Sequence, residues 1–391
     1  MHWLFGLIPN LINTIYPSSS GAIHALWTFP AIVLLALVIS LGADSAQYYI
    51  SQGLALAILA WMQTAPEFMV EADLAWHKEV HLLLANLTGS LRLLTGLGLP
   101  LVFFVSYLYH GRGGKNTTIH IDSAHSIEVV SFTAGVLYLV VVYVKGSLTM
   151  LDGILLLLLY LIYLFFLTRL PSREKGEPAK MEYVPGKIMH MSRWYRSASI
   201  LALFVIGGVG LILVVGPFIN SMKGVAVAVG VSDFVFIQWL SPFLSEFPEK
   251  LSAFMWTKKE EGTTMGLMNI VSSTVNQLTL LPALLPFIYA YAVGSVTPIQ
   301  FGAHQRSEIL LTIAQCSTTI VLLVDMKFSS YEAGGLFIIW CIQFFVPAAR
   351  TIVTMIFFLW TLTEIGLIVL KVKGVDSVEN FIGTYKRYIK T

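Results

Sequence analysis

The sequence has few charged residues and almost no cysteine. Asp, Glu, Lys and Arg make up 12% of its 391 residues, against roughly 25% in an ordinary soluble domain. A soluble chain of this length needs far more charge to cover its surface, so the composition excludes a soluble enzyme, a disordered chain and a nucleic-acid-binding protein. Cys316 and Cys341 both lie in apolar runs, and we interpret them as packing residues rather than as a disulfide or a metal pair.

Motifs of enzymes and of resident metal sites are missing as well. The sequence contains no phosphate-binding loop and no nucleophile elbow, so we predict neither enzymatic activity nor a bound cofactor. His77 and His81 have the i, i+4 spacing of a zinc site. Glu79, however, points to the other side of a helix and no third ligand is apparent, so we interpret the segment as a turn at the membrane interface.

Long apolar runs dominate the chain instead. Hydrophobic residues make up 56% of it, without counting 30 glycines. A membrane-spanning segment must satisfy its own backbone polar groups, so apolar runs of about 20 residues form helices. We therefore predict an all-α, multi-pass membrane protein surrounded by lipid. Its 11 candidate spans lie near residues 22–42, 45–72, 80–108, 124–144, 150–169, 197–219, 223–256, 263–293, 305–324, 332–348 and 350–371.

Basic residues between the spans predict the orientation. The longest polar segment, residues 170–196, is rich in Lys and Arg, and such loops lie on the cytoplasmic side. Counting spans outward from this loop places the basic C-terminal tail inside and residues 1–21 outside. Residues 1–21 contain no Lys or Arg, so we expect an interfacial extension rather than a secretory signal. We expect the protein in the plasma membrane, and its oligomeric state is not specified by the sequence.

Polar landmarks recur in the two halves of the chain at a nearly constant offset. Pro66-Glu67 in the second span and Pro248-Glu249 in the seventh are 182 residues apart. Within two or three residues, the same offset relates Asn86 to Asn269, Ser90 to Ser273, Glu128 to Glu308 and Arg169 to Arg350. Each repeat contains five spans, and because five is odd the second copy enters the membrane in the opposite orientation. Inverted repeats of this kind are typical of secondary transporters.

The repeat divides the chain into five parts. We predict an N-terminal interfacial extension at 1–21, a first five-helix repeat at 22–169 and a basic cytoplasmic loop at 170–196. A second, inverted five-helix repeat follows at 197–348, and an extra span with a basic tail occupies 349–391. In such transporters the substrate site lies near the middle of the membrane, where the two repeats meet.

The two Pro-Glu segments have the features of a cation site. Proline breaks a membrane helix, and broken helices are tolerated where they line a site. A carboxylate in the membrane costs roughly 3 kcal/mol or more, so Glu67 and Glu249 need partners or protons. The helices that follow add oxygen-bearing side chains on one face, at Asn86 and Ser90 and again at Asn269, Ser273 and Gln277. Oxygen ligands suit hard cations such as Ca²⁺.

These segments resemble the two signature repeats of the calcium/cation antiporter superfamily, the sodium/calcium exchangers. The resemblance covers about residues 22–348 and identifies the chain as a divergent member. It implies a ten-helix core, with residues 350–371 as an additional span. It also implies that Glu67 and Glu249 are the central cation ligands. The full set of candidate ligands is Gln63, Thr64, Glu67, Asn86, Ser90, Ser245, Glu246, Glu249, Asn269, Ser273 and Gln277.

Three departures from the family pattern affect cation preference. The family has Thr and Ser four and three residues before each glutamate, whereas this chain has Gln63 and Thr64 in the first repeat and Ser245 and Glu246 in the second. The family's acidic or amide residue four positions beyond the later serine is Leu94 in the first repeat. Its counterpart in the second repeat is Gln277, which is neutral. One coordinating side chain is thus lost and one carboxylate is added.

The resemblance implies a secondary antiporter that exchanges Ca²⁺ for Na⁺ by alternating access, with these cations as its partners. Glu246 and Leu94 leave open coupling to protons, or exchange of another divalent cation, on the same scaffold. An intramembrane enzyme with Glu67 and Glu249 as acid and base, or a cation sensor that does not transport, are alternatives of another class. Arg92 points away from the polar face, so we expect it to pair with a carboxylate or to face a water-filled crevice.

Overall fold

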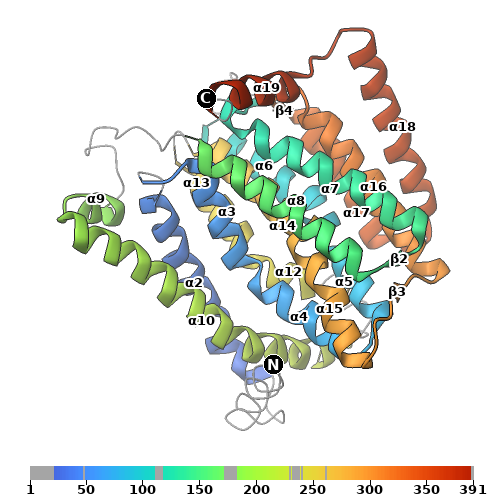
Figure 1. Ribbon diagram of the computed structural model, residues 1–391, viewed down its shortest axis with the longest axis horizontal. Coiled ribbons are helices and arrows are strands. Elements are labelled where there is room, and N and C mark those ends of the chain that lie inside the picture. The colour runs from blue at the N-terminus through green and yellow to red at the C-terminus, as the bar shows by residue number, and fades with distance from the viewer. Residues whose placement is uncertain are drawn as a thin grey trace.

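A computed structural model describes residues 22–46, 49–110, 118–170, 183–228, 230, 238, 241–259 and 262–388. The described part of the chain is almost entirely helical (Figure 1). Residues 1–21, for which we predicted an interfacial extension, lie outside the described residues. The helices are α2 (Ala25–Ala46), α3 (Gln52–Gln63), α4 (Ala65–Trp76), α5 (Val80–Leu93), the π-helix η2 (Leu94–Gly98), α6 (Leu99–His110), η3 (Ser123–His125), α7 (Ser126–Lys145), α8 (Met150–Arg169), α9 (Tyr183–Met189), α10 (Arg193–Ala228), α12 (Ser241–Ser245), α13 (Phe247–Thr257), α14 (Thr263–Leu278), α15 (Leu280–Val293), α16 (Ala303–Leu323), α17 (Ser330–Phe345), η6 (Pro347–Ala349), α18 (Arg350–Val369) and α19 (Asp376–Tyr388).

Most of the expected spans are present as long apolar helices. In the described part of the chain, eight helices are long and apolar enough to cross a membrane, or nine if the bent pair 53–63 and 67–76 counts as one span. The expected span at 332–348 corresponds to α17, which has only 16 residues. The expected span at 223–256 lies partly outside the described residues, and its described part contains the short helices α12 and α13.

One predicted boundary is wrong. We expected a loop between spans at residues 220–222, but α10 runs without interruption from Arg193 to Ala228. Asn220, Ser221 and Lys223 lower the local hydropathy there, but a dip in hydropathy does not by itself end a helix. Helix α10 even continues through Pro217. The start of α10 also shortens the predicted 170–196 loop, within which α9 forms a further short helix.

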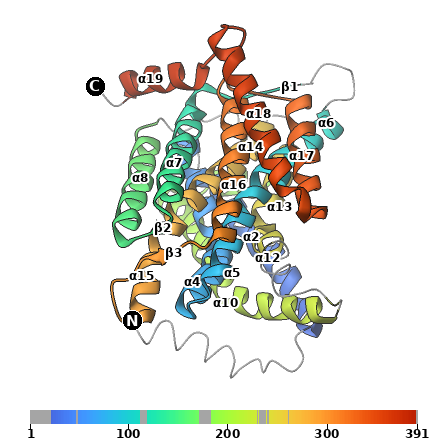
Figure 2. The same cartoon turned by 90° about the vertical axis from the view of Figure 1, so that its right-hand side faces the viewer.

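Two short antiparallel strand pairs join the halves of the molecule. Strand β1 (Thr118–His120) pairs with β4 (Lys327–Ser329), and β2 (Ser147–Leu148) pairs with β3 (Ile299–Gln300). An offset of 181 residues relates β1 to β3 and β2 to β4. By the same offset Ile119 corresponds to Gln300 and Ser147 corresponds to Phe328, so the Ile119–Phe328 pair of one ribbon matches the Gln300–Ser147 pair of the other. The register is therefore the one that a two-fold axis between two repeats requires. Figure 2 shows β1 toward the end that carries α19, with β2 and β3 toward the other end.

Matching helix starts follow the strands. A capping box begins α8, where the Thr149 hydroxyl accepts from the Asp152 backbone and the Asp152 carboxylate accepts from the Thr149 backbone. Ser329 and Glu332 form the same arrangement at the start of α17, 180 residues later. Each box satisfies backbone donors that the first turn of a helix leaves without partners.

The helices pack around a mostly apolar core, and apolar side chains also cover much of the outside. Helices α2 and α10 lie side by side at one edge (Figure 1). At Gly207 a Cβ atom would lie 2.3 Å from Cγ1 of Ile39, so this close approach requires glycine, as is common between membrane helices. The outer faces of α8 and α18 expose large apolar side chains, as expected against lipid; these include Leu151, Ile154, Leu158, Ile352, Met355 and Leu359.

Candidate cation-binding site

Two helix breaks form the centre of the site, as the prolines predicted. Helix α3 ends at Gln63 and α4 begins at Ala65, with a bend of 48° between residues 53–63 and 67–76. In the second half α12 ends at Ser245 and α13 begins at Phe247. Glu67 and Glu249 lie in the first turns of α4 and α13, where the helix dipole favours a negative charge.

Glu67 links the two halves directly. Its Oε1 accepts hydrogen bonds from the Asn86 amide and the Ser90 hydroxyl of α5. Its Oε2 accepts from the hydroxyl of Ser245, which lies 178 residues later in the chain. Glu67 is completely buried, so the three donors replace the water that its carboxylate loses. The first and second signature segments therefore meet at one carboxylate.

Glu249 and Glu71 are buried carboxylates with free oxygen atoms. Both are fully buried, and their carboxylate oxygens accept no hydrogen bond from the described residues. Glu249 interacts electrostatically with Glu246 and Glu67, and Glu71 with Glu67 and Glu246. Burying charge without partners is very unfavourable. Charge balance at Glu67, Glu71 and Glu249 therefore requires bound cations or protons.

Glu246 has partners of its own. Its Oε2 lies 2.6 Å from Nζ of Lys250, and its Oε1 accepts from Nε2 of Gln277 at 3.1 Å. Glu246 is completely buried and Lys250 is 5% exposed. The additional carboxylate that departs from the family pattern is thus paired with a cation from the chain itself.

The remaining candidate ligands divide into two groups. Several buried oxygens have no hydrogen-bond partner among the described residues and are available to a cation; they are Oδ1 of Asn86, Oδ1 of Asn269, Oγ of Ser273 and Oε1 of Gln277. Gln63 and Thr64 form a second group, because each donates a hydrogen bond to a neighbouring group. Nε2 of Gln63 donates to Oγ of Ser252 at 2.6 Å, and the Thr64 hydroxyl donates to the Trp61 carbonyl at 3.0 Å. A ligand role for these residues stays a prediction.

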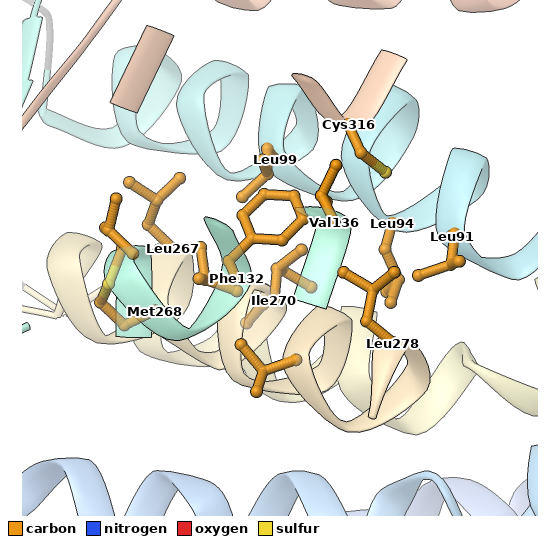
Figure 3. Close-up of a cluster of buried hydrophobic side chains, with 14 of the residues drawn as sticks. Leu91, Leu94, Leu99, Phe132, Val136, Leu267, Met268, Ile270, Leu278 and Cys316 are labelled. Atoms are coloured by element: carbon orange, nitrogen blue, oxygen red, sulfur yellow. The ribbon is translucent and has the colours of Figure 1, made fainter. Parts of the chain in front are cut away.

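Leu94 contributes to the apolar core rather than to the polar centre. Its side chain is fully buried and lies in an apolar cluster with Leu91, Val136, Leu278 and Cys316 (Figure 3). It also begins the π-helix η2 that separates α5 from α6. No oxygen ligand is therefore available at this position of the first repeat.

Sequence reasoning missed Glu71 and Lys250. Both are charged residues inside predicted spans, which is an unfavourable position unless the residue is functional or paired. Glu71 lies one helical turn after Glu67, and Lys250 directly follows Glu249. That spacing was the signal that could have identified them.

A second buried polar cluster lies beside the site. Nη2 of Arg92 is 2.6 Å from Oε2 of Glu308, and Nη1 of Arg350 is 2.6 Å from Oε1 of the same residue. The expectation that Arg92 pairs with a carboxylate is confirmed. A Cβ atom at Gly89, next to Ser90, would lie 2.1 Å from the Gln238 carbonyl oxygen, so the packing of α5 in this region requires glycine.

The other polar candidates have structural positions. His77 lies just after α4, and Lys78, with φ of 64°, completes a tight turn before α5. The predicted turn is therefore present, and its location at the membrane interface stays a prediction. Nδ1 of His125 lies 2.9 Å from Oε1 of Glu128, and both are buried. Across the described part of the chain, no three His, Cys, Asp or Glu side chains gather closely enough to hold a resident metal ion. The candidate centre combines carboxylates with hydroxyl and amide oxygens instead.

Comparisons with known proteins identify the family of this chain. The model of the sodium/calcium exchanger protein family matches residues 20–169 and 199–367, whereas no curated protein sequence matches the chain. A crystal structure of the H⁺/Ca²⁺ exchanger CAX is 28% identical, with a TM-score of 0.82, and the alignment covers 98% of this chain and 95% of that one.

Structures of the sodium-calcium exchanger NCX_Mj share the fold. One, soaked with 100 mM Na⁺ and 10 mM Sr²⁺, is 19% identical with a TM-score of 0.61, over 84% of this chain and 99% of that one. Another, soaked with 10 mM Na⁺ and no Ca²⁺, is 19% identical with a TM-score of 0.60, over the same shares of the two chains. The chain is thus a multi-pass integral membrane protein that belongs to the sodium/calcium exchanger protein family.

Proposed function

We propose that this protein is a secondary antiporter that exchanges Ca²⁺ for monovalent cations at the centre formed by Glu67 and Glu249. The observation that carries the proposal is the junction of the two helix breaks. There the Ser245 hydroxyl of one half donates to Glu67 of the other, beside a Glu249 carboxylate that accepts no hydrogen bond from the described residues. Such a centre offers oxygen ligands and negative charge to a bound cation.

The ligands and the charge suit Ca²⁺. Ca²⁺ takes about 6–8 oxygen ligands, and the carboxylates of Glu67 and Glu249 balance its two charges. Buried amide and hydroxyl oxygens of Asn86, Asn269 and Ser273 add neutral ligands. When Ca²⁺ leaves, two carboxylates would remain buried without charge balance, which is unfavourable by several kcal/mol. Release therefore requires the entry of other cations, which is the physical basis of antiport.

We propose protons as the coupling ion, although the family resemblance led us to predict Na⁺. A Na⁺ site needs a shell of oxygen ligands, and Leu94 supplies none from the first repeat (Figure 3). A proton needs only one basic oxygen, and Glu71 offers a further buried carboxylate. The similarity to the structure of an H⁺/Ca²⁺ exchanger extends over 98% of the chain. Coupling to Na⁺ is the competing outcome of the experiment below.

The membrane orientation follows from the charges. We propose that the 170–196 segment and the C-terminal tail face the cytoplasm, because Lys and Arg collect in these segments. We also propose that the membrane in which the protein lies is the plasma membrane. Single cysteines placed near Lys187 and near Lys386 should then react with a membrane-impermeant maleimide only in inside-out vesicles. Labelling in right-side-out vesicles would contradict the orientation.

Reconstitution of the full chain into liposomes tests the function. Ca²⁺ uptake is measured with an external Ca²⁺ indicator under an outward proton gradient without Na⁺, and separately under an outward Na⁺ gradient at equal pH. We expect uptake with the proton gradient and little with the Na⁺ gradient. The opposite result would establish Na⁺ coupling, and Ca²⁺ binding without uptake under either gradient would indicate a sensor. E249Q should abolish uptake, whereas E332Q, which changes a buried carboxylate paired with Lys373, serves as a matched control.

A further inference from the structure

Lys250 is a cation built into the candidate site. It directly follows Glu249, is 5% exposed, and its Nζ lies 2.6 Å from Oε2 of Glu246. The second oxygen of Glu246 accepts from Gln277, so both carboxylate oxygens have partners. An ammonium group inside a membrane protein is unfavourable unless it is paired. Glu246 and Lys250 therefore form a pair without net charge next to the two proposed Ca²⁺ ligands.

The corresponding positions in the first repeat carry no charge. The 182-residue offset places Thr64 opposite Glu246 and Phe68 opposite Lys250. The first repeat is neutral at these positions, and the second is neutral only because Lys250 balances Glu246. Without Lys250 the site would contain one more negative charge, on a carboxylate that could bind a hard monovalent cation.

We propose that Lys250 determines the charge stoichiometry of exchange, because its ammonium takes the place of one transported monovalent cation at Glu246. The proposal rests on the proposed antiport. A mobile cation at Glu246 would cross the membrane in each cycle and would add one charge to those exchanged for Ca²⁺. The ammonium is tethered to the chain, so it balances Glu246 in every state and is never released. It therefore fixes the number of monovalent charges per Ca²⁺ at a lower value.

The proposal predicts a change of one elementary charge per cycle. In K250M the Glu246 carboxylate loses its partner, and a further monovalent cation binds there and is transported. A membrane potential of 100 mV acting on one additional charge changes the equilibrium Ca²⁺ gradient by roughly 50-fold. K250R keeps the charge, and K250M/E246Q removes both members of the pair. Both of these variants should therefore exchange with the wild-type stoichiometry.

The experiment uses the full chain in liposomes whose potential is clamped with K⁺ and valinomycin at 0 and 100 mV, at fixed gradients of pH and Na⁺. The equilibrium Ca²⁺ ratio is read from trapped and external indicators. We expect the response of K250M to differ from wild type by roughly 50-fold, and K250R and K250M/E246Q to match wild type. Repeating the assay without Na⁺, and then at varied pH, tells whether the additional cation is Na⁺ or a proton.

Two results would overturn the proposal. The first is a K250M response equal to that of wild type, and the second is a K250M/E246Q response that differs from wild type. If K250M does not fold, the double variant decides, because it contains neither charge. Wild-type protein that moves no Ca²⁺ at all would instead contradict the proposed antiport, so the two failures can be distinguished.

Discussion

Replacing Glu67 with glutamine tests the electrostatic basis of the site while keeping its shape. Oε1 of Glu67 accepts from Asn86 and Ser90, and Oε2 accepts from Ser245. In E67Q the amide oxygen can accept the two bonds of Oε1, and the Ser245 hydroxyl can rotate to accept from the new NH₂ group. The hydrogen bonds survive in a neutral form, so we expect a loss of folding stability of only about 1 kcal/mol.

The effect on Ca²⁺ should be far larger. At an effective dielectric constant of about 20, two unit charges 4 Å apart interact by about 4 kcal/mol, and a divalent ion doubles this to about 8 kcal/mol. Part of this is offset because the neutral amide is easier to bury than a carboxylate. If half remains, the loss is about 4 kcal/mol, which corresponds to roughly a thousandfold weaker Kd.

Two measurements on purified full-length protein check the reasoning. Equilibrium binding of ⁴⁵Ca²⁺ in detergent gives Kd, and thermal unfolding gives Tm. We expect E67Q to weaken Kd by roughly a thousandfold with a Tm shift of about 1 °C, since 391 residues unfold with about 2.1 cal/mol/K each. The control is E128Q, which removes a fully buried carboxylate paired with His125 outside the site. A Kd for E67Q within tenfold of wild type, or an equal loss of binding in E128Q, would refute the electrostatic argument.

Three further predictions concern the surroundings of the site. G89A would place a Cβ atom 2.1 Å from the Gln238 carbonyl oxygen, so we expect about 1–3 kcal/mol of destabilisation and slower Ca²⁺ uptake. Unchanged Tm and uptake would contradict the close packing of α5 against Gln238. E308Q leaves the guanidinium groups of Arg92 and Arg350 without their shared carboxylate, and should lower Tm by about 4–6 °C. A shift below about 1 °C would show that these charges are solvated. Burial alone would lower the pKa of Lys373, but neighbouring carboxylates more than offset this and raise its pKa above the usual 10.5. Its charge therefore stabilises the fold below pH 10.5, and this contribution is lost as pH rises through the raised pKa. Thermal unfolding of K373M should show a Tm below that of wild type at pH 8, and the difference should shrink above about pH 11. A difference that stays constant with pH would contradict a link between the charge of Lys373 and folding stability.

Local chemistry made much of this protein predictable from its sequence. Hydropathy identified the spans because each membrane helix satisfies its backbone internally. Proline identified the breaks next to Glu67 and Glu249 because the missing N–H acts within a few residues. The continuation of α10 through 220–223 was missed because a dip in hydropathy resembles a loop when the packing of the helix is unknown.

The tertiary structure decided which groups meet. The hydroxyl of Ser245 reaches Glu67 across 178 residues, and Glu308 is shared between Arg92 and Arg350. Lys250 balances Glu246, whereas Glu71 has no hydrogen-bond partner in the described structure. Spacing along the chain determines which side chains share one helix face, but it does not determine which faces of distant helices pack together. That choice follows from the three-dimensional fit of the two halves, and it is this fit that brings Ser245 of the second half to Glu67 of the first.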